Sequence, residues 1–170
     1  MASLIDELIS VLEQETEEYH QLIDISSKKT NAIVKNDLDE LRRITATEQD
    51  FVSRLINLEK KREDVTGDIA LVLNKKKEEM TVKSLIPILQ SQKEVQERLI
   101  SVHDRIKRTL KDFQMVNEIN KNLIQESLEL IEFNMNLVTG MYQAPEVANY
   151  SKDAANVSPS MDIGVFDAKQ

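Results

Sequence analysis

Leucine, isoleucine, valine and methionine recur three and four residues apart over most of this chain, and few residues interrupt that pattern. Only three glycines and three prolines occur in 170 residues, which leaves little of the punctuation that strands and tight turns need. Aromatic residues make up 4% of the chain, so aliphatic side chains must supply the core. The spacing predicts an all-α fold, an elongated antiparallel helical bundle or coiled coil of about three long helices with a flexible C-terminal tail.

Breaks in the apolar pattern divide the chain into segments. Helices are predicted over about residues 3–35, 38–74 and 84–141, forming a bundle of residues 1–142. The short link at Asn36 and Asp37 favours an antiparallel hairpin, with Asp37 capping the second helix three residues before Glu40. Ser84 as a cap and Pro87 in the first turn indicate the start of the longest helix. The charged residues 75–83 predict a solvated connection before it.

Polar residues interrupt the helical stripes. In the first two helices these are Glu15, Ser26, Lys29, Glu48 and Arg62. Further along, the stripe passes through an asparagine-rich stretch, residues 117–136, and asparagine at a buried seam is costly unless it is hydrogen-bonded. Two interpretations follow: the asparagines fix register or oligomeric state, or they line a partly polar groove for a helical partner.

Apolar side chains between residues 123 and 141, Leu130 and Phe133 among them, occupy more than one helical face, which is wider than a single seam needs. Such a second apolar surface indicates either self-association or binding of another protein. Residues 143–170 are rich in proline, asparagine and serine and predict a flexible tail, with apolar residues near its end. The candidate partner-binding residues are Leu123, Ile124, Leu128, Ile131, Leu137, Val138, Met141, Val165 and Phe166.

Composition argues against several other functions. The net charge of −8 disfavours nucleic acid and anionic membranes as partners. No apolar run approaches the roughly 20 residues of a membrane span, and no basic segment at the start suggests a secretory signal, so a cytoplasmic protein is expected.

Residue types that carry chemistry are few. The spacing Glu17-x-x-His20 has no second copy to complete a di-metal site, and there is no cysteine. Neither a glycine-rich phosphate loop nor a nucleophile with its base is recognisable. We therefore expect no metal, no cofactor and no enzymatic activity.

Four stretches of the chain resemble the FlgN family of bacterial flagellar export chaperones, and together they cover residues 1 to about 140. They are Leu4-Ile5 through Leu8-Ile9-Ser10-Val11-Leu12 to Glu15 and Tyr19; Ala32-Ile33-Val34-Lys35-Asn36-Asp37-Leu38; Glu48 with Leu55, Leu58-Glu59 and Arg62; and Asn117-x-x-Asn120-x-x-Leu123-Ile124-x-x-Ser127-Leu128.

The resemblance implies a cytoplasmic chaperone that binds the helical ends of hook–filament junction proteins and passes them to the flagellar type III export apparatus. It also implies that the client-binding part lies toward the C-terminal end. The alternative is a structural coiled coil, a dimer or spacer whose wide apolar surface is covered by its own copy, so a homo-oligomer stays open.

If the tail contributes to client capture, a chain that ends at Tyr142 should retain less hook–filament junction protein in a pull-down. Its helical melting transition, followed by circular dichroism, should be nearly unchanged, because the tail lies outside the predicted bundle. Capture equal to that of the full chain would exclude a role for the tail.

Overall fold

In the computed structural model the described residues are 2–143, and every element among them is a helix. The long helices are α1 (Ala2–Val34), α2 (Leu38–Val72) and α4 (Lys93–Gln143). Between α2 and α4 lie three short pieces: η1 (Lys77–Glu79), α3 (Val82–Leu85) and η2 (Ile86–Leu89). The predicted all-α fold of long helices is confirmed. The tail from residue 144 onward lies outside the described residues.

By its internal contacts the chain divides into two units, Met1–Glu132 and Phe133–Gln170. The first unit contains α1, α2, the short helices and most of α4. Of the second unit, the structure describes the end of α4, from Phe133 to Gln143.

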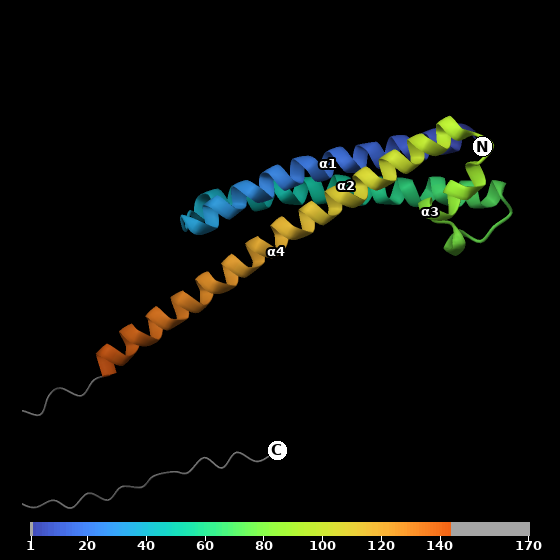
Figure 1. The fold of residues 1–170 in the computed structure, drawn as a ribbon. Helices are drawn as coiled ribbons and strands as arrows, with labels where there is room; N and C mark the ends of the chain where they lie inside the picture. Colours follow the sequence, from blue (N-terminus) through green and yellow to red (C-terminus); the bar gives the residue numbers. More distant parts are fainter. Residues whose placement is uncertain (1, 144–170) are drawn as a thin grey trace, which may run out of the picture. The chain divides into compact units, whose positions relative to one another are not determined.

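A tight turn joins α1 to α2, and the two helices lie side by side in Figure 1. Asn36 adopts a left-handed conformation with φ 53°, which asparagine tolerates better than most residues. As predicted, Asp37 caps α2: its carboxylate accepts a hydrogen bond of 3.0 Å from the backbone N–H of Glu40. Such a cap stabilises a helix by about 1 kcal/mol.

Hydrogen bonds across the bundle fix the directions of the helices. From α2, Arg62 reaches Glu15 and Arg54 reaches Glu18, so a later residue of α2 faces an earlier residue of α1 and these helices are antiparallel. Residues of α1 and α4 that are hydrogen-bonded to each other are separated in sequence by 92, 89, 90 and 94 positions, so these helices are parallel. With this offset, Val34 at the end of α1 is level with about Ile124 of α4.

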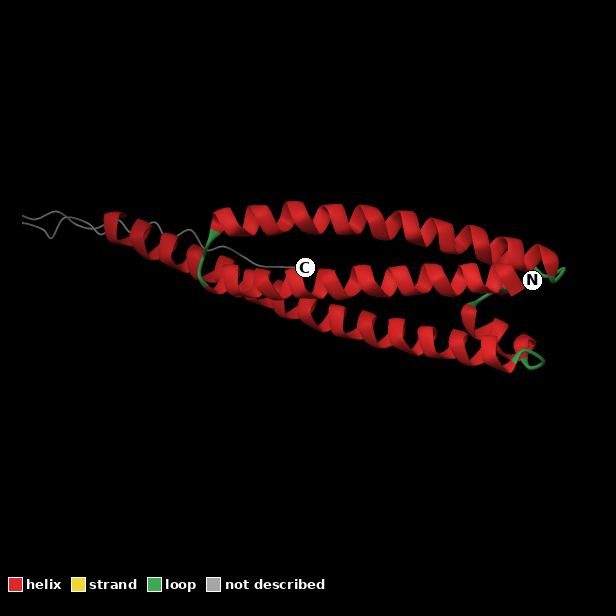
Figure 2. Cartoon of the chain, turned by 90° about the horizontal axis from the view of Figure 1, so that it is seen from above, coloured by secondary structure: helices red, strands yellow, loops and turns green. Residues whose placement is uncertain are grey.

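The main hydrophobic core lies where α1 begins and α2 ends, at the same end as the loops beside the N-terminus in Figure 2. Its buried residues are Ile5, Leu8, Ile9, Leu12, Val65, Ile69, Ala70, Met80, Leu85, Leu89, Leu99, Val102 and Ile106. Three of them, Met80, Leu85 and Leu89, come from the connection between α2 and α4. This connection closes the end of the bundle.

The prediction that the last long helix begins near residue 84 is wrong, because α4 begins at Lys93. Thr81, not Ser84, is the N-cap of the short α3, and Ser84 completes a capping box with it. Pro87 lies in η2. A helix that continued straight from residue 84 would carry Leu85 and Leu89 away from the core, so their burial favours a broken connection. Met80 is likewise buried within the stretch that was expected to be solvated.

Toward the hairpin turn, a polar layer links all three long helices. Ser26 on α1 donates to a Glu48 carboxylate oxygen on α2 at 3.0 Å, and Lys29 donates to the other oxygen at 2.7 Å. Asn120 on α4 donates to the Ser26 carbonyl at 2.8 Å and accepts from the Thr30 hydroxyl at 2.6 Å. Because each of these polar groups finds its partner at only one axial position of the helices, the layer fixes their register.

Of the two interpretations of the asparagines, the structural one therefore holds for Asn120, which is only 2% exposed. Asn117 and Asn122 are exposed. The layer also explains why polar residues interrupt the first two stripes at Ser26, Lys29 and Glu48.

Replacing Asn120 by alanine should lower the free energy of unfolding by about 1–2 kcal/mol, because two hydrogen bonds in a buried layer are lost. The matched change Asn122→Ala, two positions along at an exposed site, should alter it by less than about 0.5 kcal/mol. Urea denaturation followed by circular dichroism measures both. Equal effects of the two changes would show that the polar layer contributes nothing measurable.

Candidate functional site

The strip of α4 that faces the other helices continues beyond the point where α1 ends. Upstream, Leu99, Val102 and Ile106 of this strip are buried in the core. The same spacing of three and four residues continues to Ile124, Leu128 and Ile131, which are 38%, 61% and 52% exposed. We call these three residues the α4 strip. They remain exposed because α1 and α2 turn back at Asn36 and Asp37, level with the beginning of the strip.

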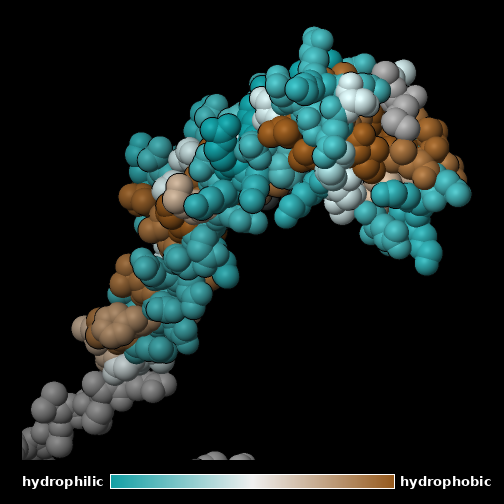
Figure 3. All heavy atoms as spheres, turned by 45° about the vertical axis from the view of Figure 1, so that its right-hand side comes forward, coloured by the Kyte–Doolittle hydropathy of each residue, from teal (hydrophilic) through white to brown (hydrophobic). Residues whose placement is uncertain are grey.

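In the second unit the described end of α4 also carries exposed apolar side chains. Figure 3 shows brown, apolar side chains along the part of α4 next to the grey residues. The exposed large apolar residues of this part are Phe133, Met135, Leu137, Val138 and Met141. The apolar spacing of the helix therefore persists through both units.

The site residues predicted from the sequence fall into three groups in the structure. Leu123 is half-buried, and the α4 strip is exposed in the first unit. Leu137, Val138 and Met141 are exposed in the second unit. Val165 and Phe166 lie outside the described residues.

Five exposed large apolar residues of α4 were not among the predicted site residues, and two of them, Met115 and Ile119, lie upstream of the α4 strip. Leu130 and Phe133 belong to the wide apolar stretch seen in the sequence, and Met135 was missed. Its position four residues after Ile131 and three before Val138 is the signal that would have identified it.

A second surface feature lies inside the first unit, where α2 and α4 leave a groove of about 520 Å³ between them. We call it the groove. Its floor is formed by α1 and its walls by α2 and α4, with residues 81–83 at one end. The residues that line it are Leu12, Glu15, Tyr19, Leu22, Val52, Leu55, Ile56, Glu59, Arg62, Thr81, Val82, Lys83, His103, Ile106, Lys107, Leu110 and Phe113.

Apolar surface dominates the groove. On the α2 wall Val52 and Ile56 are 45% and 59% exposed. Tyr19 of the floor meets Phe113 of the α4 wall with their ring centroids 5.6 Å apart. The sequence signal for this surface was the presence of Ile56 outside the main stripe of the second helix, which widened its apolar face.

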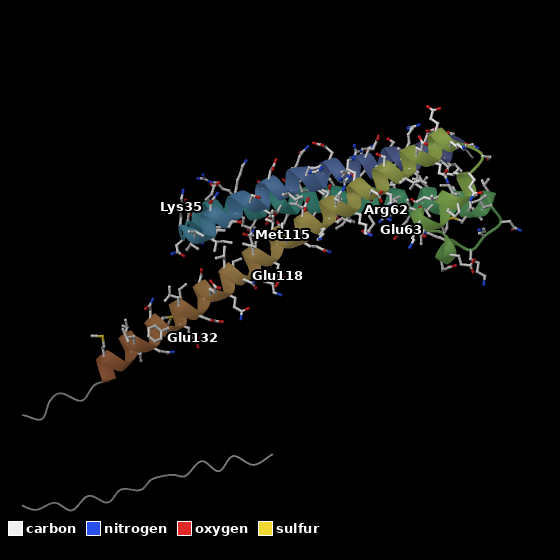
Figure 4. All side chains as sticks on the ribbon, in the orientation of Figure 1. Lys35, Arg62, Glu63, Met115, Glu118 and Glu132 are labelled. Carbon is white, nitrogen blue, oxygen red and sulfur yellow. The ribbon has the colours of Figure 1, made fainter. Side chains whose placement is uncertain are left out.

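Charged side chains are fixed in the floor of the groove. Arg62, labelled on α2 in Figure 4, lies between two carboxylates, 3.0 Å from Glu15 and 3.5 Å from Glu59. Burial raises the pKa of Glu15, while Arg62 acts in the opposite direction. Burial, followed by the charges of Glu15 and Glu59, also raises the pKa of Tyr19.

Lysines lie at the open side of the groove. Lys83 and Lys107 are exposed, and neither forms an ion pair with a described residue. Their positive charges are thus available to an acidic partner, and the groove combines an apolar lining with a basic rim.

Metal ligands and membrane-spanning segments can be assessed for residues 2–143. Within that part of the chain no three histidine, cysteine, aspartate or glutamate residues gather closely enough to hold a metal ion. His20, which the sequence set beside Glu17, is exposed and approaches the Thr109 hydroxyl at 3.3 Å. Nor does any helix in this range combine the length and apolar character needed to cross a bilayer.

Comparison with known protein families gives a match over most of the chain. The family model described as FlgN protein matches residues 1–158, which includes all the helices and both surface features. No curated protein and no solved structure matches the chain.

Replacing Glu15 by glutamine should change the pH dependence of stability in a defined direction. A carboxyl whose pKa is raised in the folded state adds to the free energy of unfolding at pH values below its ordinary pKa of 4.5. This stabilisation is lost as the pH rises through the raised pKa. The Glu15→Gln variant should therefore gain stability relative to the unchanged chain as the pH rises from below 4.5 toward neutrality. Urea denaturation across this range measures the difference.

The control is Glu17→Gln, at an exposed position of the same helix. A stability difference that is independent of pH for Glu15→Gln, or that has the opposite trend, would contradict the raised pKa.

Proposed function

Because the chain belongs to the FlgN family, we propose that it is a cytoplasmic export chaperone for the hook–filament junction proteins of the flagellum. In this proposal it binds their helical ends, keeps them from aggregating or assembling early, and delivers them to the flagellar type III export apparatus. It acts by binding and not by catalysis. Family membership supports the general role of flagellar export chaperone, and the client and its delivery are the finer part of the proposal.

The exposed α4 strip is the observation that carries the proposal. Burying a large aliphatic side chain contributes about 1.5–3 kcal/mol, yet Leu128 and Ile131 are more than half exposed. Neighbouring exposed apolar residues of this kind are typical of an interaction surface. A client helix that covers the strip supplies the burial that α1 and α2 do not.

Charge on the same stretch limits how the client lies. Glu126, Glu129 and Glu132 are exposed, and Glu132 is labelled on α4 in Figure 4. The helical spacing places Glu126 on the face opposite the α4 strip, and places Glu129 and Glu132 on one flank of the strip, with Glu132 one turn after Leu128. We therefore expect an amphipathic client helix to pack along the strip, with apolar anchors three and four residues apart.

The rigid part of the protein is separate from this surface. The buried core and the polar layer hold the first unit together without using Leu128 or Ile131. Client binding can therefore be changed without unfolding the bundle, which is a requirement for a carrier that captures and releases its cargo.

Replacing both Leu128 and Ile131 by serine should weaken binding of a purified hook–filament junction protein from the same organism by roughly 10- to 100-fold, because two apolar anchors are lost. The helical content should stay nearly constant, since both side chains are exposed within one copy of the chain. Isothermal titration calorimetry and circular dichroism measure the two quantities.

The matched control is Leu71→Ser with Val72→Ser, two exposed apolar positions at the end of α2, away from the α4 strip. It should bind as the unchanged chain does. A chain that captures no junction protein at all, while forming a tight dimer, would instead favour the structural coiled coil.

A further inference from the structure

The groove of the first unit is an incomplete helix-packing site. Two helical walls and a helical floor surround about 520 Å³, and Val52 and Ile56 of one wall are about half exposed. Packing of this kind is completed when a fourth helix fills the space between the walls. An occupant must be apolar on one side and must suit a basic rim.

The occupant's charge follows from the rim. Lys83 and Lys107 are exposed and form no ion pair with a described residue. Arg62 in the floor is already neutralised by Glu15 and Glu59. An acidic amphipathic helix therefore fits this rim better than a basic one.

One segment with these properties is present in the chain itself, residues 123–132 of α4. It carries the α4 strip together with Glu126, Glu129 and Glu132, and it contains no lysine or arginine. The segment thus offers an apolar face that can cover the exposed apolar wall of the groove.

Length also agrees. The floor residues run from Leu12 to Leu22 along α1, which at the rise of an α-helix is about 15 Å. The segment 123–132 has nearly the same length, also about 15 Å.

The segment and the groove that it fills belong to different copies of the chain. One wall of the groove, His103 to Phe113, and the segment lie on the same uninterrupted helix, α4. A straight helix cannot fold back onto its own wall without a break, and α4 has none between Lys93 and Gln143. The occupant must therefore come from a second molecule.

We propose that the free chain forms a dimer in which residues 123–132 of each copy lie in the groove of the other. Each copy has one groove and one segment, so a reciprocal exchange leaves neither uncovered and closes the assembly at two copies. Apolar burial against Val52 and Ile56 stabilises the contact, and Glu129 and Glu132, on one flank of the strip, meet Lys83 and Lys107.

A functional consequence rests on the function proposed above. If the α4 strip binds the client, the dimer occupies the same strip, so client and second copy exclude each other. The dimer is then the storage form of the empty chaperone, and the client releases the groove as it binds.

Two charge-reversed variants of the full chain test the dimer without any client. One carries Lys83→Glu with Lys107→Glu in the groove, and the other carries Glu129→Lys with Glu132→Lys in the segment. In sedimentation equilibrium the unchanged chain should dimerise, and each variant alone should show a dissociation constant raised by about tenfold or more, because like charges then meet in both contacts.

An equimolar mixture of the two variants is the decisive measurement. In the mixed dimer the reversed, acidic groove of one copy meets the reversed, basic segment of the other, and the unchanged, basic groove meets the unchanged, acidic segment. Both contacts of the heterodimer pair opposite charges, so the mixture should dimerise as tightly as the unchanged chain.

The control variant carries Lys60→Glu with Lys111→Glu, which changes the net charge equally at exposed positions that do not line the groove. It should dimerise normally, and circular dichroism should show all variants to be folded. A monomeric unchanged chain, or dimerisation that the reversals and their mixture leave unaffected, overturns the proposal. Either result leaves client capture, measured separately, as the test of the proposed function.

Discussion

The extent of the α1–α2 hairpin determines what the rest of the first unit can do. α1 ends at Val34 and α2 begins at Leu38. Between them the chain reverses direction, because Asn36 is left-handed and Asp37 caps the start of α2. The apolar strip of α4 does not end at the same level, and its next residues, Ile124 and Leu128, are exposed. A bundle that needed only stability would bury these side chains, so their exposure indicates a surface that binds a partner.

Stability and binding are supplied by different levels of the same bundle. At one end, the connection between α2 and α4 folds Met80, Leu85 and Leu89 into the core. At the other end, a hydrogen-bonded layer around Ser26 and Asn120 takes the place of apolar packing. This layer contributes less to stability than an apolar core but defines the register, and the register sets which residues of α4 lie beyond α1. The groove between α2 and α4 lies between these two levels.

Much of the fold could be predicted from the sequence, because apolar spacing and local capping act within a few residues. The hairpin turn with its Asp37 cap and the approximate ends of the first two helices follow from such local signals. The start of α4 could not be predicted this way: Ser84 and Pro87 have the local chemistry of a helix start, but burial of Leu85 and Leu89 decides that the chain bends there. At the candidate site, the exposed residues of α4 came from the width of the apolar face, whereas the groove requires three helices at once.

The sequence by itself determined that the chain is helical, which residues of each helix are apolar, and that the stretch from residue 123 carries more apolar surface than one seam uses. Only the tertiary structure decided which of these apolar residues are buried. Asn120 and Ile124 are four residues apart on nearly the same face of α4, yet one is buried and the other is not. The reason is that helical periodicity is a local property, while burial depends on whether a second helix, distant in sequence, reaches the same level.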